Sequence, residues 1–425
     1  MTPLVSTLKN GLRVLRLQDK NAAGVSIVML VGVGSRHETE EQGGIAHFLE
    51  HSLFKGSKNY PTSKAIGMAV ELLGGSSNAF TSYDYTGYYI KVPMHTAEQA
   101  TAILADMIMY PVFDEREIEK ERGVIIEEIR MYNDEPRSRA SDLFNERLFQ
   151  GHPLGRDIAG TIETVSSMTP DKLRGFVARN YHSRNMLLIF SGNFEPDTAQ
   201  AWAEEHFSDI PAGEAVATEL FKRPDNLNEV LYHEKQLEQT HMVLGGFASR
   251  RTHPDRFKYQ VGNALLSYGF GSRLFQTIRD ELGLAYYISS GISSYEETGK
   301  FMIRLGSDAT RAKEAVTAVL RELSAVIAGD FSDEELTRAK NYLIGTMTTQ
   351  LEATDEIALW YGMQLMLRKE ILSYEEISSR IEAVTRDEVT EAWSSVITSD
   401  NLLLSVLGPE ISADTRDLQL SVGTV

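Results

Sequence analysis

The chain contains AEQATAILADMIMYPVFDEREIEKERGVIIEE at Ala97–Glu128 and a similar segment, AKEAVTAVLRELSAVIAGDFSDEELTRAKNYLIGT, at Ala312–Thr346. Both segments place a helical pattern before a phenylalanine and a second, acidic helix start, with a small difference in length before it. Self-similarity at a distance of this kind indicates a duplicated structural unit. We therefore predict two similar halves, residues 1–210 and 229–425, joined by the polar, turn-rich linker at residues 211–228.

The sequence around these segments predicts an α+β fold. In the first half we expect strands at Thr7–Leu17, Gly24–Val33, Gly75–Phe80, Tyr85–Val92 and Met186–Gly192, and helices from about Gly44 and at Ser63–Leu73, Ala97–Met109 and Glu115–Asn133. The second half repeats this order, with strands in VLYHEK and THMVLGGFA and at Tyr286–Ser293 and Gly299–Gly306, and helices at Arg256–Leu266 and before Leu284. Each half is therefore expected to form a mostly antiparallel sheet with helices packed on it.

The composition excludes several classes of protein. The 425 residues carry a net charge of -18, and an acidic surface repels the phosphates of nucleic acids. The most apolar early segment, Val25–Val33, is far shorter than the roughly 20 residues of a membrane-spanning helix, so it is interpreted as a buried strand. The N-terminal sequence does not resemble a signal peptide, which makes a cytoplasmic location the default expectation.

A possible metal site lies in GGIAHFLEHSLFKGS (Gly43–Ser57), which contains an HxxEH pattern. On an α-helix His47 and His51 lie about 40° apart and one turn along the axis, so both imidazoles can reach one tetrahedral ion. Glu50 projects about 60° to the other side of His47, where it can act as a general base toward the attacking water. Without the flanking sequence, two histidines at this spacing are as easily ordinary helix residues.

The third metal ligand is expected from a second helix. The chain has no cysteine, so a zinc site must use His, Asp or Glu and leave one position open. In EREIEKERGVIIEEIRMY, Glu121 and Glu128 are seven residues apart and share one helix face. We assign Glu128 as the ligand, with Glu127 as the competing choice, and Glu121 as a carboxylate that orients a histidine or stabilises the charge of the site.

Several motifs together resemble the M16 or pitrilysin metallopeptidases: GIAHFLEHSLFKGS, GSSNAFTSYDYTGYY, ERGVIIEE and SRLFQTIRDELGLAYYI. The match extends over nearly the whole chain, and the length is similar to that of the short-subunit branch, which includes mitochondrial processing peptidase and its bacterial relatives. The resemblance implies one zinc ion per chain, bound by His47, His51 and Glu128, with water activated by Glu50 and support from Glu121.

The resemblance also implies where a substrate binds. NAFTS is similar to an exposed edge strand that pairs with the substrate backbone, which gives Asn78, Ala79 and Phe80 contact roles. IRDELGLAYYI matches a motif that supplies an arginine and a tyrosine to the substrate or the tetrahedral intermediate, here Arg279 and Tyr286. Without the resemblance, a surface ion pair and a packed strand aromatic are the simpler interpretations of these two residues.

The second half has no HxxEH, and Thr346 and Ala339 stand where the first half has Glu128 and Glu121. We therefore expect one catalytic half and one inactive half that acts as a substrate clamp, the two enclosing a chamber. The predicted function is that of a zinc metalloendopeptidase, and the alternative is a non-catalytic or partner-dependent subunit of an M16-type complex. Since one chain carries both the zinc and the Arg/Tyr motifs, a homodimer is the expected assembly, without nucleic-acid or membrane partners.

Overall fold

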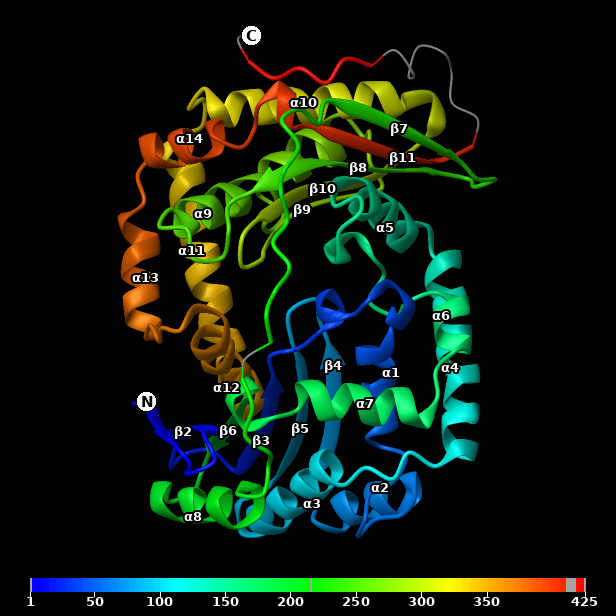
Figure 1. The fold of residues 1–425 in the computed structure, drawn as a ribbon. Coiled ribbons are helices and arrows are strands. Elements are labelled where there is room, and N and C mark those ends of the chain that lie inside the picture. Colours follow the sequence, from blue (N-terminus) through cyan, green and yellow to red (C-terminus); the bar gives the residue numbers. More distant parts are fainter. Residues whose placement is uncertain (1, 215, 410–417, 424–425) are drawn as a thin grey trace. The chain divides into compact units, whose positions relative to one another are not determined.

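The computed structural model of the protein describes residues 2–214, 216–409 and 418–423 (Figure 1). The chain forms two compact units. The first unit contains the residues up to Met131 together with Arg156–Glu219 and Gln350–Ile371. The second contains Tyr132–Gly155, Leu220–Thr349 and the described residues from Leu372 onward. Each unit is built around one β-sheet, as the α+β prediction requires.

The first unit has a six-stranded sheet in the order β1-β2-β6-β3-β5-β4. Its strands are β1 (Leu4–Thr7), β2 (Arg13–Gln18), β3 (Gly24–Val31), β4 (Ser76–Thr81), β5 (Thr86–Pro93) and β6 (Met186–Gly192). Only β2 and β6 run parallel, and the other neighbours are antiparallel. The helices of this unit are α1 (Ile45–Ser52), α2 (Ser63–Leu72), α3 (Ala97–Met109), α4 (Glu115–Asp134), α6 (Ile162–Ser166), α7 (Pro170–Asn180), α8 (Pro196–Phe207) and α12 (Thr354–Met363). Strand β4 lies at one edge of the sheet.

The second unit repeats this topology in a five-stranded sheet of order β7-β11-β8-β10-β9. Its strands are β7 (Glu229–Glu234), β8 (Thr240–Ala248), β9 (Tyr287–Ser294), β10 (Gly299–Ser307) and β11 (Leu403–Gly408). Its helices are α5 (Pro136–Leu148), α9 (Arg256–Ser267), α10 (Ala312–Ile327), α11 (Asp333–Gln350), α13 (Tyr374–Ala383) and α14 (Arg386–Ser394). Apart from β1, both sheets share one chain order, and each has one parallel pair, here β7 with β11. The two units therefore resemble each other as duplicates do, and the prediction of two similar α+β halves is confirmed.

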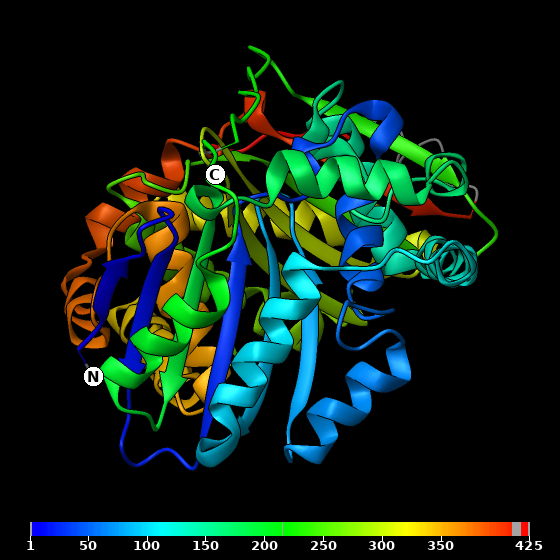
Figure 2. The same ribbon diagram turned by 60° about the horizontal axis from the view of Figure 1, so that its bottom comes forward.

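Both faces of the first sheet are buried, and strand β3 shows why its sequence is apolar throughout. Successive side chains in a strand point to opposite faces. Val25, Ile27 and Met29 join the larger core, which includes side chains of α3, α7 and α8, while Val28 and Leu30 pack against α12 on the other face. Figure 2 shows α3 (cyan) and α8 (green) beside the strands of this sheet. Burial on both faces explains the run VSIVMLV, which was interpreted as a buried strand.

Each unit includes a helix from the other half of the sequence. Helix α12 packs on β3 and β6 of the first unit, and α5 packs on β8 and β11 of the second. Within residues 211–228, the described residues form no helix or strand, and Ala215 lies outside the described residues. Each compact unit is assembled from several separate segments of the chain. The predicted linker at residues 211–228 therefore separates the two sequence repeats and stays a prediction.

Two predicted elements differ from the structure. The single strand predicted at Thr7–Leu17 is wrong: β1 and β2 form a hairpin, closed by a hydrogen bond from the Leu8 amide to the Leu12 carbonyl at 2.8 Å. Gly11 in this turn has φ 94°, and Asn-Gly is a strong hairpin signal that the alternating pattern obscured. The helix before Leu284 is a π-helix at Leu274–Glu281, with an i→i+5 bond from Leu282 to Thr277.

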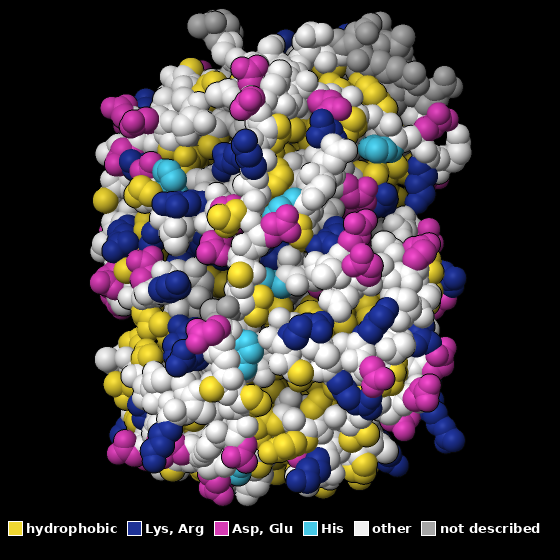
Figure 3. Space-filling view, viewed as in Figure 1, with side chains coloured by type: hydrophobic (Ala, Val, Ile, Leu, Met, Phe, Trp, Pro, Cys, Tyr) yellow, Lys and Arg dark blue, Asp and Glu magenta, His cyan; other side chains and the backbone are white. Residues whose placement is uncertain are grey.

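Figure 3 shows acidic and basic side chains interspersed over one face of the molecule. In the part of the chain that the structure describes, none of the helices combines the length and apolar character needed to cross a bilayer.

Lys300, in β10, is a buried cation whose contribution to stability depends on pH. Its ammonium donates to the Asn145 side chain of α5 at 2.5 Å, and burial, together with nearby Arg304, lowers the pKa of Lys300 from 10.5 to about 7. Between these values the unfolded chain binds one more proton than the folded chain, so stability should rise as pH increases from about 7 toward 10. Urea unfolding of wild type and Lys300→Met should show a smaller rise in the variant, and an identical pH dependence would contradict this assignment.

Candidate metal centre

Helix α1 is fixed at its N-terminus by a glycine and a buried carboxylate. Gly44 has φ 87°, and a Cβ atom there would lie 2.4 Å from the Ala159 carbonyl oxygen, so only glycine fits. The Glu38 carboxylate accepts hydrogen bonds from the amides of Gly44 and Ala46, both at 2.8 Å. These contacts satisfy free N–H groups at the helix start. The start of α1 is thus held in place by contacts that do not involve its histidines.

The sequence of α1 separates a core face from a polar face. Ile45, Phe48 and Leu49 are fully buried, whereas His47, Glu50 and His51 are not. The rings of His47 and His51 lie 4.7 Å apart between centroids, at an angle of 67°. The i, i+4 spacing therefore places both imidazoles next to each other, as helix geometry requires.

Glu128, on α4, completes a group of three side chains that could hold a metal ion. One ligand atom from each of His47, His51 and Glu128 lies within 4.8 Å of the others. The Glu128 Oε2 atom is 3.6 Å from His51 Nε2 and 3.9 Å from His47 Nε2. Ligands at about 2.1 Å from a tetrahedral zinc ion are about 3.4 Å apart, so these three groups fit zinc with a small inward adjustment.

Glu127, the competing ligand, has a different environment. Its carboxylate lies 2.5 Å from the Arg130 guanidinium, and its side chain is 70% exposed, compared with 24% for Glu128. Glu127 also lies outside the group of three potential ligands. The geometry therefore favours Glu128.

Glu121 links the site to a lysine that the sequence interpretation did not include. Its carboxylate is 2.7 Å from His51 Nδ1 and 2.6 Å from the Lys55 ammonium. A carboxylate on Nδ1 fixes the ring and leaves Nε2 toward the metal. Burial alone would raise the pKa of Glu121, but the hydrogen bonds from His51 and Lys55 lower it overall. Lys55 follows His51 by four residues, a spacing that could have identified it.

The two histidines differ in their affinity for protons. Burial lowers the pKa of His47 to about 4, and the neighbouring His51 adds to this effect. His47 is therefore neutral at physiological pH, which is the form that binds metal. For His51 burial acts in the same direction, but the hydrogen bond and charge of Glu121 outweigh it and raise the pKa.

Glu50 projects from α1 toward strand β4. The Thr81 hydroxyl, at the end of that strand, donates to the Glu50 Oε2 atom at 2.6 Å. Burial raises the pKa of Glu50 above the usual range for a glutamate, and the Thr81 hydrogen bond partly opposes this shift. The site thus has a partly buried carboxylate next to the potential metal ligands, which is suited to proton transfer.

Strand β4, which contains the residues predicted to contact a peptide, is the last strand of its sheet. It pairs with β5 alone among the described strands. Asn78 is exposed, while Ala79 and Phe80 are partly buried and pack against the cores on opposite faces of the sheet. The outer edge of β4 therefore has backbone groups that pair with none of the described strands, with the exposed Asn78 side chain beside them.

Arg279 and Tyr286 belong to the second unit. Arg279 lies in the π-helical segment, with its guanidinium 4.9 Å from the centre of the Phe275 ring. Tyr286 precedes β9 and is 57% exposed. The ring of the next residue, Tyr287, instead packs against the Arg137 guanidinium. Its hydroxyl shares a hydrogen bond with His241 Nδ1 at 2.9 Å. Of the two tyrosines, Tyr286 has the more accessible side chain.

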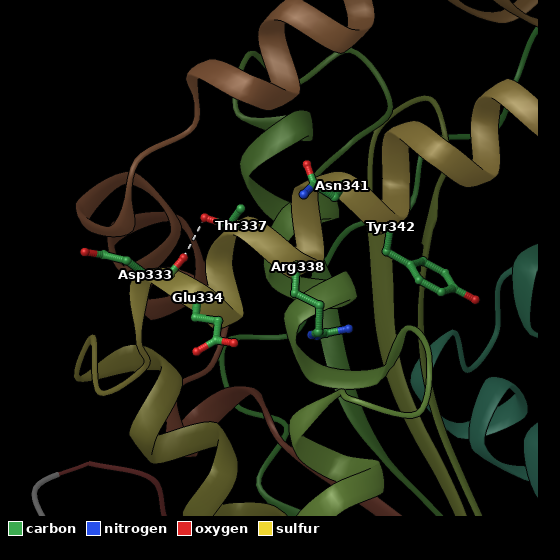
Figure 4. Close-up of a pocket in the computed structure, with 6 residues that line it drawn as sticks. All are labelled: Asp333, Glu334, Thr337, Arg338, Asn341 and Tyr342. Carbon is green, nitrogen blue, oxygen red and sulfur yellow. Dashed lines mark hydrogen bonds between the residues drawn. The ribbon is translucent and has the colours of Figure 1, made fainter.

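A groove of about 730 Å³ lies along α11 in the second unit (Figure 4). All the residues that line it come from this one helix: Asp333, Glu334, Thr337, Arg338, Asn341 and Tyr342. The Arg338 guanidinium already donates to the backbone carbonyls of Tyr268 and Ala264. We do not assign a function to this groove, because it has no histidine and its cation stabilises the local fold.

Sequence comparison with known proteins identifies the family of the chain. Residues 13–162 match the sequence model of the family described as "Insulinase (Peptidase family M16)", and residues 167–343 match "Peptidase M16 inactive domain". The chain is 33% identical over 398 residues to the uncharacterized zinc protease YmxG of Bacillus subtilis, covering 93% of this chain and 96% of the relative. The chain belongs to peptidase family M16.

Other M16 relatives extend over a similar length. An uncharacterized zinc protease of Streptomyces coelicolor is 30% identical over 410 residues, covering 95% of this chain and 89% of the relative. The predicted membership of the M16 zinc metallopeptidases is thereby confirmed. The names of these relatives also support zinc as the metal of the family.

Solved structures show the same M16 fold. A protease from Helicobacter pylori aligns with a TM-score of 0.89 at 23% identity, covering 96% of this chain and 99% of that one. A Pseudomonas fluorescens protein described as a peptidase M16 inactive domain aligns with a TM-score of 0.90 at 22% identity, covering 97% and 99%. At these identities the alignments establish the fold alone.

Proposed function

We propose that this M16 chain is a zinc-dependent endopeptidase that hydrolyses peptides or unfolded segments. The observation that supports this most directly is the group His47, His51 and Glu128 with the Glu50 carboxylate beside it. A zinc ion held by these three side chains would polarise the scissile carbonyl and make water more acidic. The remaining chemistry is a transfer of protons by the chain's own residues.

Glu50 is the proposed general base. It takes a proton from the attacking water and later passes it to the leaving amine, so the peptide bond breaks without a covalent intermediate. Its raised pKa, a result of burial, makes the carboxylate a better proton acceptor than an exposed glutamate. Glu121 orients His51 through the hydrogen bond at Nδ1.

The substrate is proposed to bind by strand addition at the free edge of β4. Backbone hydrogen bonds from Asn78, Ala79 and Phe80 would hold an extended peptide with little dependence on its sequence. Arg279 would bind the substrate, and the Tyr286 hydroxyl would stabilise the oxyanion of the tetrahedral intermediate.

The test is hydrolysis of a quenched fluorescent peptide library by the purified, zinc-loaded chain alone. Cleavage within the peptides, abolished by a chelator and restored by zinc, would support an endopeptidase. A chain that binds zinc stoichiometrically but cleaves no peptide would favour the alternative, a non-catalytic or partner-dependent subunit. The match of residues 167–343 to an inactive domain is compatible with either function, because that half lacks the ligand set.

We also propose that the active assembly is a homodimer. One chain carries the metal group as well as Arg279 and Tyr286, so no different subunit is needed to supply them. Sedimentation of the active protein at micromolar concentration should show a dimer. Full activity in a sample that contains monomer alone would contradict this assembly.

A further inference from the structure

Thr81 connects the edge strand β4 to the carboxylate of Glu50. Its hydroxyl is the donor of the 2.6 Å hydrogen bond, since an ionised carboxylate can only accept. Hydrogen bonds to charged groups are shorter and stronger than neutral ones. The bond joins two residues 31 positions apart in the sequence. It therefore fixes the orientation of the Glu50 side chain relative to the strand.

The backbone on both sides of this bond is held by one segment, Gly34–Glu38. The amides of Ser35 and Arg36 donate to the carbonyl oxygens of Ser82 and Tyr83, at 3.0 and 3.1 Å, in the turn that follows Thr81. At the other end of the segment, Glu38 binds the start of α1, the helix that carries Glu50.

A buried ion pair strengthens the same connection. The Arg36 guanidinium lies 3.0 Å from the Asp84 carboxylate, and these side chains are 0% and 9% exposed. The turn after Thr81 and the start of α1 are thus tied to one short piece of backbone. Thr81 and Glu50 consequently face each other from two elements that are bonded to the same segment of backbone.

The hydrogen bond uses only one oxygen of the Glu50 carboxylate. Oε2 accepts from Thr81, and Oε1 has no hydrogen-bond partner among the described residues. Without this hydrogen bond the carboxylate plane could turn, and the side chain could swing, away from the geometry needed for proton transfer. Retention of Oε2 by Thr81 keeps Oε1 available to the attacking water.

We propose that Thr81 is a positioning residue: its hydroxyl holds Glu50 in the orientation in which Glu50 accepts a proton, and it ties this orientation to the strand that binds the peptide. This inference rests on the proposed function, because it assigns Thr81 a role in that reaction. It predicts an effect on turnover and not on peptide or zinc binding. The alternative is that Thr81 serves only as a β-branched residue that suits a strand.

Two substitutions separate these roles. Thr81→Val keeps the shape and β-branching of threonine but lacks the hydroxyl, whereas Thr81→Ser keeps the hydroxyl and loses a methyl group. Thr81→Val should lower kcat about ten- to a hundredfold, with KM and zinc content unchanged, because one hydrogen bond to a charged group is lost. Thr81→Ser should retain kcat within a few-fold of wild type. A structural role predicts the opposite order.

The Glu50→Gln background provides the decisive comparison. If Thr81 acts through Glu50, adding Thr81→Val to Glu50→Gln should not reduce the residual rate further. The affinity of an intact peptide for Glu50→Gln, measured by fluorescence anisotropy, should be the same with and without Thr81→Val. This second readout does not depend on turnover, and a weaker affinity would show that Thr81 supports binding.

The outcomes distinguish this inference from the proposed function. An active wild type with an unaffected Thr81→Val, or a Thr81→Ser as slow as Thr81→Val, would overturn the positioning role alone. A zinc-loaded wild type that cleaves no peptide would overturn the proposed function and the role of Thr81 within it. An active wild type with a slow Thr81→Val, rescued by serine, would support both.

Discussion

The Glu50→Gln variant should bind zinc as wild type does and lose peptide hydrolysis by roughly 10²–10⁴-fold, the range expected when a general base is removed. Glutamine has nearly the same shape as glutamate, so the contact with Thr81 and the packing of α1 should be preserved. The amide, however, cannot accept the proton of the attacking water. The measurement is kcat/KM with a quenched fluorescent peptide, together with metal analysis of the same preparation.

Metal analysis is the essential control for Glu50, which lies next to the potential ligand His51. A variant that loses zinc in proportion to activity would indicate that Glu50 supports the metal and not proton transfer. A variant that keeps zinc and cleaves at the wild-type rate would exclude Glu50 as the base. Loss of activity with zinc retained is the result that assigns it.

The second large effect is a loss of zinc binding, which we expect for a substitution of Glu128 but not for one of its neighbour Glu127. Loss of a residue that only hydrogen-bonds to a metal ligand weakens metal binding roughly 10- to 100-fold. Glu128→Gln removes a ligand itself, so zinc affinity should fall by more than this, and activity should fall with the zinc content. Glu127→Gln is the matched control, because it makes the same chemical change one residue away on the same helix. Its side chain is exposed and paired with Arg130, so zinc binding and activity should stay at the wild-type level.

Competition with a zinc-binding dye would measure both affinities, and circular dichroism would check that each variant folds. Equal weakening in the two variants would indicate a general effect of charge on α4. Strong weakening in Glu127→Gln alone would reverse the ligand assignment. Only a selective loss in Glu128→Gln agrees with the distances from its carboxylate to His47 and His51.

The sequence predicts those parts of the fold that depend on local patterns. The apolar run Val25–Val33 indicated a buried strand, and β3 occupies Gly24–Val31 with both faces covered. The repeat of Ala97–Glu128 indicated duplication, which appears as two sheets with the same strand order. The packing of α12 on β3 could not be predicted, because nothing local in residues 354–363 specifies which sheet they cover.

In the candidate metal centre, too, local sequence patterns predict some contacts and tertiary packing decides the others. Helical periodicity alone places His47 beside His51 and Glu121 on the same face as Glu128, since these relations are one or two turns long. Bringing α1 next to α4 requires the tertiary fold, and for this the family resemblance was needed. Thr81 was missed because its partner Glu50 lies on another element, and the only signal was its position directly after Asn78–Phe80.

The interleaving of the two units constrains how the chain can be synthesised and divided. In the sheet of the first unit, Val28, Leu30 and Ile189 are covered by α12, which leaves the ribosome only after more than three-quarters of the chain. Until then an apolar surface of the nascent first unit stays open to solvent and to chaperones. A fragment that ends at residue 210 would lack α12 and keep this surface exposed, so we expect the first half of the sequence to fold poorly when it is expressed alone.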